Sequence, residues 1–354
     1  MTTETSVAPT FGMVLPIQAQ GTDLHTLLGQ LRDEVQAAER AGFRAVFLTE
    51  FHQARGGALI SPLLVAASLA PGTDSIAFGT AVLATPLHHP VRLAEDAIML
   101  DHLTGGRVVL GLGIGHQHPD FAAFGIDRRE RVSRTEETIS IVQKGFSGEA
   151  FDHQGQHFSL EAHLTPAPVQ PGGPPIWMGS HAPAGLERAA RYADRWLCDP
   201  QRDVTTVARL AEHYRTAAAE HGRSARVGLF REAWIADSAE ECERVWGPHA
   251  MTVHRLYYNV GVYLREFEPW VDEVADREDF TFDRLAPGRF LYGDGETIRA
   301  TVRAWCDATG ADHLALRMRH PGGPGHEATL EAIERFGREV IGPLEADADR
   351  VASL

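Results

Sequence analysis

The stretch SIAFGTAVLATPLHHPVRLAEDAIMLDHLTGGRVVLGL, residues 75–112, contains two apolar strands separated by an amphipathic helix. The run Ser75–Ala81 predicts a buried strand, and the Pro at the start of Pro90–Leu103 is typical of the first helical position. The glycines at 105–106 end that helix, and Arg107–Leu112 predicts the next strand. This strand–helix–strand order indicates a parallel βαβ unit.

The same alternation continues on both sides of this unit. Further strands are predicted at Phe11–Ile17, Arg44–Thr49, Pro175–Gly179, Asp194–Leu197, Val227–Ala236 and His313–Met318. Helices are predicted at Asp23–Ala41, from Ser61 onward, and at Arg128–Gly145, Ala184–Tyr192, Val204–His221, Glu296–Thr309 and Glu327–Val340. Eight strands alternating with helices, without a visible break in strand order, predict a (β/α)8 TIM barrel. An open doubly wound sheet is the alternative.

The chain of 354 residues exceeds the roughly 250 residues of a minimal barrel. Two irregular stretches account for the excess as insertions, about 147–174 after the fourth strand and 247–290 after the seventh. We expect a disordered tail over 1–10 and one catalytic domain over 11–345. We expect the stretch 145–174 to form a lid over the substrate.

Composition excludes several classes of function. The chain has 33 Lys and Arg against 48 Asp and Glu, a net charge of −15, and no basic cluster, which disfavours nucleic acids and anionic membranes as partners. It has no apolar run of about 18 residues, and its first ten residues do not resemble a signal peptide. Its three cysteines lack CxxC spacing, which indicates free thiols in a reducing compartment. We therefore expect a cytoplasmic protein.

In a TIM barrel the active site lies at the carboxyl ends of the strands. The segments that follow predicted strands and carry polar residues or glycines are Glu50–Gln53, Ala81–Pro90, Gly113–His118, Gly179–His181 and Arg317–His320. The glycines after the fourth strand let the backbone approach a flat or anionic ligand, although simple turn geometry also explains them. Ser180 precedes a predicted helix, so it either helps to bind an anion or only caps the helix.

Metal binding and serine catalysis are the less favoured interpretations. His116 and His118 have a ligand-like spacing, but carboxylates near the strand ends are few, and neither HExxH nor a Cys/His quartet occurs. The sequence also lacks GxSxG. We expect these histidines to face a cofactor or solvent, with no metal bound.

Four segments together resemble the luciferase-like monooxygenases, the bacterial luciferase superfamily of flavin-dependent TIM barrels. They are AGFRAVFLTEFH (41–52), FGTAVLATPLHHPVRLAEDAIMLDHLTGGRVVLGLGIG (78–115), DFAAFGID (120–127) and GQHFSLEAHLTPAPVQPGGPPIWMGS (155–180). The resemblance covers about Phe11–Leu197 and extends more loosely to the C-terminus.

The resemblance implies that a reduced flavin binds in the barrel mouth. Ala81 and Val82 would lie against the isoalloxazine ring, joined by a non-proline cis peptide bond. The residues that would flank the flavin are Gly113, Ile114, Gly115 and His116, the last through its backbone near the phosphate. Gly179 and Ser180 match the family's phosphate-binding turn, which favours the anion-binding interpretation of Ser180.

The sequence departs from luciferase at the position of the catalytic base. Luciferase has two adjacent histidines after the second strand, and the first acts as the base. Here Phe51 takes the first position and His52 the second, so light-producing aldehyde chemistry is not expected. We expect His52 to act as the acid/base group, since imidazole titrates near neutrality, with Glu50 orienting it.

A second departure concerns the phosphate. The family's phosphate-contacting arginine is replaced by Ile114, and its reactive cysteine by Gly113. We therefore expect another cation, Arg134, or backbone N–H groups to meet the phosphate.

The resemblance implies a two-component monooxygenase. A separate flavin reductase would supply reduced FMN, and the barrel would shield a flavin hydroperoxide while one oxygen atom of O2 enters a small organic substrate. The alternatives are a deazaflavin-dependent hydride-transfer enzyme on the same barrel, a non-catalytic flavin-binding homologue and, outside the family, a metal-dependent hydrolase. Relatives carrying deazaflavin often have Thr-Gly-Glu where this chain has Ile114-Gly115-His116, which favours FMN. Family members commonly form homodimers.

Overall fold

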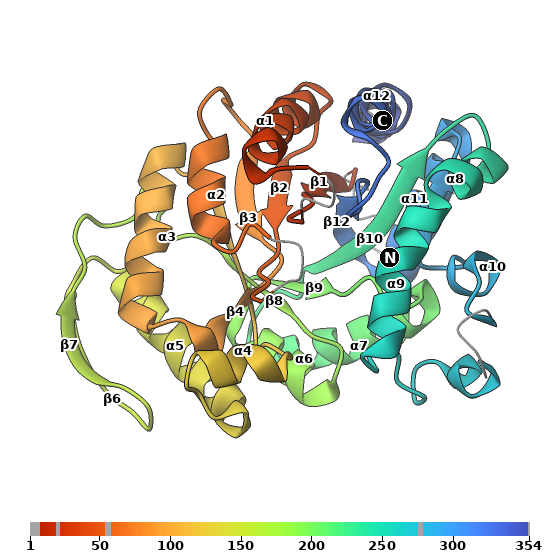
Figure 1. Cartoon of the computed structure of the whole chain (residues 1–354). Helices are drawn as coiled ribbons and strands as arrows, with labels where there is room; N and C mark the ends of the chain where they lie inside the picture. Colours follow the sequence, from red (N-terminus) through yellow and green to blue (C-terminus); the bar gives the residue numbers. More distant parts are fainter. Residues whose placement is uncertain (1–7, 19–21, 54–57, 275–278, 353–354) are drawn as a thin grey trace.

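Eight parallel strands close into a barrel in the computed structural model, which describes residues 8–18, 22–53, 58–274 and 279–352 (Figure 1). The barrel strands, in spatial order, are β1 (Thr10–Val14), β2 (Ala45–Leu48), β3 (Ala77–Thr80), β5 (Val108–Gly113), β8 (Ile176–Gly179), β9 (Arg195–Cys198), β10 (Val227–Ile235) and β12 (Ala311–Arg317). Strand β12 pairs in parallel with β1 and closes the ring. The predicted TIM barrel is therefore confirmed, and the open sheet is excluded.

Helices follow the strands as predicted. They are α1 (Leu24–Arg40), α2 (Pro62–Leu69), α3 (Pro90–Thr104), α5 (Arg131–Gly145), α6 (Pro183–Tyr192), α7 (Val204–Glu220), α11 (Gly295–Thr309), α12 (His326–Phe336) and α13 (Gly342–Ala352). The carboxylates of Asp23, Asp203 and Asp294 cap α1, α7 and α11 by accepting backbone N–H bonds. Ser61 occupies the N-cap position of α2 without making such a bond, and Pro62 occupies the first turn.

Several short elements lie outside the predicted alternation. They are β4 (Leu83–Ala84), α4 (His118–Ala123), a 3-10 turn at Arg128–Glu130, α8 (Ala239–Val245), α9 (Gly247–Asn259), a 3-10 turn at Pro269–Glu273, α10 (Phe282–Leu285), β11 (Phe290–Gly293) and a π turn at Gly337–Ile341. Strand β11 pairs in parallel with the second half of β10, which extends beyond the barrel. No helix in the described part of the chain is long and apolar enough to cross a bilayer.

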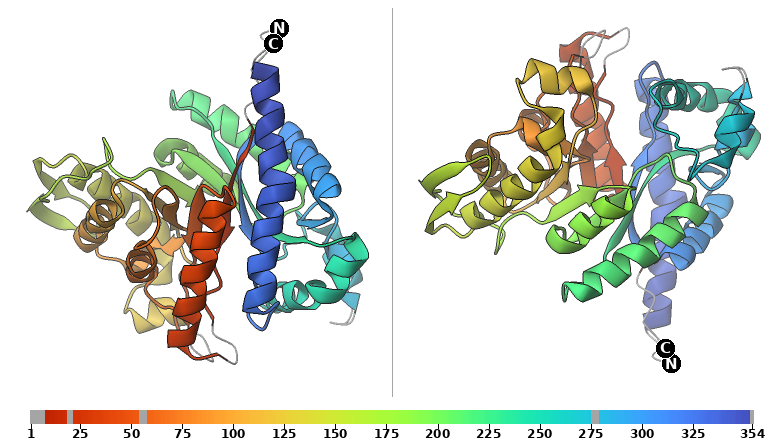
Figure 2. Two further views of the ribbon diagram at one scale, coloured as in Figure 1. Left: turned by 90° about the horizontal axis from the view of Figure 1, so that it is seen from above. Right: turned by 90° about the horizontal axis from the view of Figure 1, so that it is seen from below.

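The first insertion is an antiparallel hairpin, β6 (Ala150–Gln154) and β7 (Ser159–His163). It lies on the outer side of α3 and α5, away from the barrel axis, in the views of Figures 1 and 2. Glu137 of α5 fastens it there by accepting the backbone N–H groups of His157 and Phe158 and contacting the ring of His153. The prediction of a lid over the substrate was therefore wrong, because the turn of the hairpin is tied to the flank of α5.

An apolar row lies inside the barrel, with members on or directly after every barrel strand, and the buried side chains of His313 and Arg195 pack against its Trp177. Its members are Val14, Ala45, Phe47, Ala81, Val109, Trp177, Leu197, Phe230 and Ala315. The ring of Phe47 needs glycine on both neighbouring strands, since a Cβ at Gly12 or at Gly79 would lie 2.6 Å from it. This row forms the floor beneath the carboxyl ends of the strands.

Replacing Gly79 by Ala is expected to lower the free energy of unfolding by about 1–3 kcal/mol, because the new methyl overpacks the interior against Phe47. The measurement is urea denaturation followed by circular dichroism. Gly29→Ala is the control, since a Cβ at Gly29 in α1 meets no atom within 4 Å. That control is expected to be stabilising by about 0.5–1 kcal/mol. Equal effects of the two substitutions would contradict the packing argument.

Candidate active site

The inward side of the barrel becomes polar or side-chain-free directly above the apolar row. Alternate residues of a strand point to the same face, so the next inward positions follow from that row. They are Gly111 and Gly113 on β5, Gly179 and His181 at the end of β8, Asp199 after β9, Glu232 on β10 and Arg317 on β12. The carboxyl ends of these strands surround one mouth, and the predicted site residues of β5 and β8 meet there.

The side chain of Val82 lies between two strand ends. A Cβ at Gly113 would be 2.6 Å from Val82 Cγ2, and one at Gly179 would be 3.5 Å from Val82 Cγ1. The Ala81–Val82 peptide bond is cis, as the resemblance implies. Glycine at 113 is thus required for the backbone of β5 to approach this bulge, and the result is a surface nearly free of side chains.

Thr80 holds the chain just before this bulge. Its hydroxyl donates to the carbonyl of Gly111 and accepts the N–H of the same residue, at 2.8 and 2.9 Å. A Cβ at Gly111 would lie 1.8 Å from the Thr80 carbonyl oxygen, so only glycine fits there. These two bonds of the Thr80 hydroxyl take the place of backbone hydrogen bonds between β3 and β5, at the point where the chain turns toward Val82.

The segment after β5 bends along the edge of the mouth. Gly115 has a φ of +66°, and a Cβ there would lie 3.1 Å from the ring of Phe121 in α4. His116 follows it, with its side chain partly in solvent. Burial by surrounding protein lowers the pKa of its imidazole, although the charge of Asp120 opposes this. The segment offers backbone groups rather than a reactive side chain.

Glu50 is the most buried carboxylate on the opposite side of the mouth, with 3% of its side chain exposed. It accepts the N–H of Ala84 at 2.5 Å, and His88 Nε2 lies 2.9 Å from its Oε1. Burial raises the pKa of the Glu50 carboxyl, but the hydrogen bond and charge of His88, the Ala84 N–H and the charge of His52 outweigh it, so the pKa is lowered overall. Glu50 is thus an ionised anchor for two imidazoles.

The two imidazoles differ in how they contact Glu50. His52 Nε2 is 3.2 Å from Oε1 without hydrogen-bond geometry, and its ring packs edge-on against Phe124 at 4.8 Å. His88 makes the hydrogen bond, and from the sequence it belongs to the candidate segment 81–90 without a predicted role of its own. Its position after the third strand is the one feature of the sequence that suggests a role in the site. Its contact with Glu50 could not be predicted, because 38 residues separate the two.

Ser180 lies just before α6, near several arginines, one of which, Arg188, donates from its Nε to Glu136 Oε1 at 2.9 Å. A Cβ at Gly185 would be 1.8 Å from Ser180 Oγ and 3.9 Å from Arg188 Nη1, so both polar groups converge on this glycine. Arg128 and Arg131 add two buried Nε atoms without hydrogen-bond partners. Partial burial and the positive charges of Arg128 and Arg188 lower the pKa of the Arg131 guanidinium. Three close cations beside a helix N-terminus form a surface suited to an anion.

Arg134, the cation expected from the sequence, is directed elsewhere. Its Nε donates to Glu130 Oε2 at 3.0 Å, and its guanidinium lies over the ring of Phe158 in the hairpin turn, 5.5 Å from the ring centroid. The structure therefore does not bring Arg134 to Ser180. Arg188 is the arginine that approaches the same glycine as Ser180, and the charges of Arg128 and Arg188 both act on Arg131, so the three guanidinium groups lie near one another. They lay in or near predicted helices, and no sequence pattern distinguished them.

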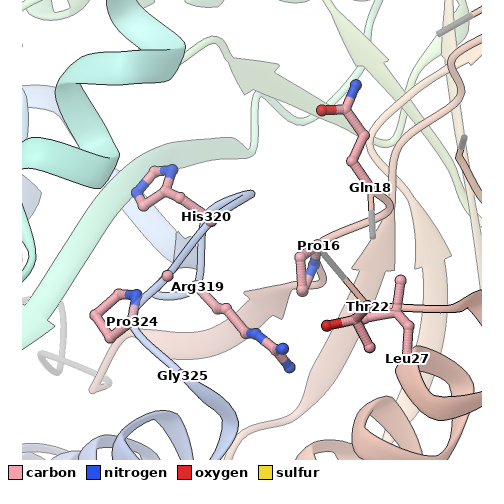
Figure 3. A pocket seen from close by; sticks show the side chains of 10 residues that line it. Pro16, Gln18, Thr22, Leu27, Arg319, His320, Pro324 and Gly325 are labelled. Carbon is pink, nitrogen blue, oxygen red and sulfur yellow. The ribbon is translucent and has the colours of Figure 1, made fainter. Parts of the chain in front are cut away.

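A small cavity of about 190 Å³ lies beside the mouth, between the segments that follow β1 and β12. Figure 3 shows Arg319 extending between these segments, with Pro16 and Gln18 on one side and His320 on the other. Arg319 is paired with Glu34 and Gln30 of α1, so its charge is already compensated. Among the residues that the structure describes, no group of three His, Cys, Asp or Glu side chains is arranged to hold a metal ion.

Comparison with known proteins agrees with this geometry. Residues 10–313 match the family model described as luciferase-like monooxygenase. The chain is 33% identical over 243 residues to a 4-hydroxyprotoasukamycin monooxygenase of Streptomyces nodosus subsp. asukaensis, covering 65% of this chain and 66% of that protein. It is 35% identical over 209 residues to an F420-dependent hydroxymycolic acid dehydrogenase of Mycobacterium tuberculosis, covering 56% and 55%.

A solved structure shows the same fold. It is a type II Baeyer–Villiger monooxygenase, the oxygenating constituent of 3,6-diketocamphane monooxygenase from the CAM plasmid of Pseudomonas putida, in complex with FMN. It superposes with a TM-score of 0.79 at 20% identity, covering 94% of this chain and 98% of that one. The family match spans most of the chain, and the chain therefore belongs to the luciferase-like monooxygenases, a family of oxidoreductase enzymes.

Replacing Glu50 by Gln is expected to lower the free energy of unfolding at pH 7 by about 1.5–3 kcal/mol, because hydrogen bonds to a charged group are lost. The folded-state pKa of Glu50 is lowered, so its stabilisation is complete above the pKa of an unfolded Glu, roughly 4.3, and is lost as the pH falls through the folded value. The difference between variant and wild type should therefore shrink below about pH 4 in urea denaturation series.

The control is Glu345→Gln, which removes an exposed partner of Arg44 and should change stability by less than about 0.5 kcal/mol. A destabilisation by Glu50→Gln that is the same at every pH would contradict the electrostatic account.

Proposed function

We propose that the protein is a flavin-dependent monooxygenase that uses reduced FMN and O2 to insert one oxygen atom into a small organic substrate. The observation that carries the proposal is the surface around Val82, where the strand ends at Gly113 and Gly179 carry no side chains of their own and pack against the Val82 side chain, next to the cationic Ser180 site. A flat ring with an anionic tail is the shape of FMN. The FMN complex of the structural neighbour supports this choice of cofactor.

The residues fit the cofactor in two parts. Arg128, Arg131, Arg188 and the N-terminal end of α6 would hold the phosphate, and the unpaired Nε atoms of the first two are donors that such a group would satisfy. The segments Ala81–Val82 and Gly113–His116 would hold the ring. Bound reduced FMN supplies the reaction with O2. The chain's own contribution is to exclude water and to hold protons at His52 and His88 beside the ionised Glu50.

We infer that a separate reductase supplies the reduced flavin. The structural neighbour is described as the oxygenating constituent of its monooxygenase, which supports a two-component arrangement. The three cysteines are free thiols, and this supports a reducing, cytoplasmic location.

The alternative function is hydride transfer with the deazaflavin coenzyme F420, which the mycobacterial relative favours. Ile114-Gly115-His116 at the end of β5 argues against it.

Purified protein would be titrated with FMN, reduced FMN and F420, then supplied with isotopically labelled O2 and a panel of small ketones, terpenes and heteroaromatic acids. Label in an organic product would support the proposal. Binding of F420 without binding of reduced FMN would replace it with the alternative, and FMN binding without oxygenation would favour a non-catalytic flavin-binding protein.

Replacing Arg188 by Gln is expected to weaken FMN binding about 10–100-fold, because a hydrogen bond between charged groups is worth about 1.5–3 kcal/mol. Affinity for riboflavin, which lacks the phosphate, should change little. Both affinities are measured by quenching of flavin fluorescence. Arg134→Gln is the matched control and should leave FMN binding unchanged. If Arg134→Gln weakens binding and Arg188→Gln does not, the phosphate site is placed wrongly.

We also propose that the chain forms a homodimer through the outer face of α2 and α3. Four large apolar side chains are exposed on or next to these adjacent helices: Ile60 (60%), Leu64 (71%), Met99 (49%) and Leu103 (62%). Exposed apolar side chains gathered on one face are typical of an interface between protein chains. A second copy of the same face would cover them symmetrically.

The double variant Leu64→Glu/Leu103→Glu is expected to elute as a monomer, because the charges would be buried unpaired in the dimer. The measurement is size-exclusion chromatography with light scattering. Leu256→Glu is the control, since Leu256 is similarly exposed on α9. A wild type that is monomeric at micromolar concentration, or a double variant that stays dimeric, would disprove this interface.

A further inference from the structure

His181 and Asp199 form an imidazole–carboxylate pair on the side of the mouth across from Glu50. Trp177 and Leu197 point into the barrel, so alternation places Gly179 on the inward side of β8. His181 follows β8 by two residues and Asp199 follows β9 by one, and the contact between their side chains brings the two strand ends together. The pair therefore faces the space above the apolar row, two residues beyond the glycine that contacts Val82.

The geometry fixes which nitrogen of His181 is free. His181 Nδ1 is 2.8 Å from Asp199 Oδ2, and the N–H of Gln201 donates to Oδ1 of the same carboxylate. Burial opposes ionisation of Asp199, but the hydrogen bond and charge of His181 and the charge of Arg202 lower its pKa to about 2. A carboxylate that stays ionised only accepts, so Nδ1 of His181 donates. Nε2, with 36% of the side chain exposed, is left to face the mouth.

The surroundings hold the pair in place. Arg231 Nη1 donates to the backbone oxygen of Asp199 from the outer side of β10. Arg202 is fully buried, and its guanidinium stacks on Phe267 with Nη1 3.9 Å from Glu268. Phe267 in turn lies edge-on to the His181 ring at 6.2 Å. Arg231 thus holds the backbone at Asp199 and Phe267 packs beside the ring, while 36% of the His181 side chain and 22% of the Asp199 side chain stay exposed.

We propose that His181 is a second acid–base residue of the active site, with Asp199 as its positioning residue. In the neutral ring, Nδ1–H is donated to Asp199 and the lone pair of Nε2 accepts a proton from a bound ligand. In the protonated ring, Nε2–H donates to the ligand, and Asp199 balances the charge. The proposal rests on the proposed flavin site, because His181 follows the Gly179–Ser180 turn directly.

The arrangement divides the mouth between two acid–base groups. Glu50, with His52 and His88, follows β2 and the β3–β4 bulge, whereas His181 and Asp199 follow β8 and β9. Val82 lies between the two groups, and a planar ligand on that surface would have an imidazole on either side. Proton transfers at two positions of one reaction would not have to share a residue.

The test combines FMN binding with the response of the His181 ring. The chain is labelled with 13C-histidine, and the His181 Cε1–H signal is identified by its loss in His181→Asn. Saturation with FMN, followed independently by fluorescence quenching, is expected to shift this signal. The His213 signal should not move, since His213 forms the same kind of pair with Glu187 on the outer surface.

A pH profile gives the catalytic readout. Oxidation of reduced FMN by O2 on the protein should show an inflection with pH that His181→Asn removes and His213→Asn leaves in place. Asp199→Asn keeps a hydrogen-bond acceptor but loses the charge, so the inflection should move to lower pH by about one unit or more. Circular dichroism confirms that each variant is folded.

The outcomes separate this proposal from the one on which it rests. If the wild type does not bind FMN at all, the proposed function fails and takes this inference with it. If FMN binds but the His181 signal stays fixed, or if the His181→Asn and wild-type profiles coincide, His181 is only a structural neighbour of Asp199 and the inference is wrong.

Discussion

The alternation of side chains along eight closed strands is the constraint from which the site follows. Once β12 pairs with β1, every second residue of each barrel strand must share the same narrow interior. That interior is filled by one apolar row, in which Phe47 and Trp177 take most of the space and Gly12 and Gly79 yield it. The inward-facing residues beyond this row, at the carboxyl ends of the strands, cannot enter the filled interior. Their side chains therefore line the mouth of the barrel.

Glycine, rather than a reactive side chain, shapes the part of the mouth that fits a flat ligand. Gly111 accommodates the carbonyl of Thr80, and Gly113 and Gly179 accommodate Val82. A methyl group at 111 or 113 would displace the chain around the cis bond. Charged groups are confined to the two sides of this surface, where each buried carboxylate has a cationic or imidazole partner.

The C-terminal half of the chain supports the mouth through buried polar contacts. Glu232 of β10 contacts Arg317 of β12, His320 and His254 of α9, and Tyr263 completes the set at His254. Arg317 and His254 lower the pKa of Glu232 despite its complete burial. Removing Glu232 or Arg317 would leave the other buried charge without its ionic partner. Through His254 and Tyr263 the same network ties the second insertion to the barrel wall.

The barrel could be predicted from the sequence because most of its strands and helices show their own pattern of apolar residues along the chain. The predicted strands Arg44–Thr49 and 107–112 differ from the observed strands β2 and β5 by one residue at each end. Strand β4 escaped prediction because it has only two residues, Leu83 and Ala84, and the hairpin β6–β7 and β11 escaped because they lie in or at the end of stretches without periodicity. Their place depends on contacts such as those of Glu137 with the hairpin turn, which local sequence does not reveal.

The sequence by itself determined the fold, the end of the barrel that carries the site, and the family. All three depend on local patterns or on motifs that are contiguous along the chain. Which side chains meet in the mouth was decided only by the tertiary structure. His88 contacts Glu50 across 38 residues, His181 contacts Asp199 from the neighbouring strand end, and Arg188 rather than Arg134 approaches the same glycine, Gly185, as Ser180. The physical reason is that hydrogen bonds and charges act over a few ångströms in space, and barrel closure sets those distances independently of separation along the chain.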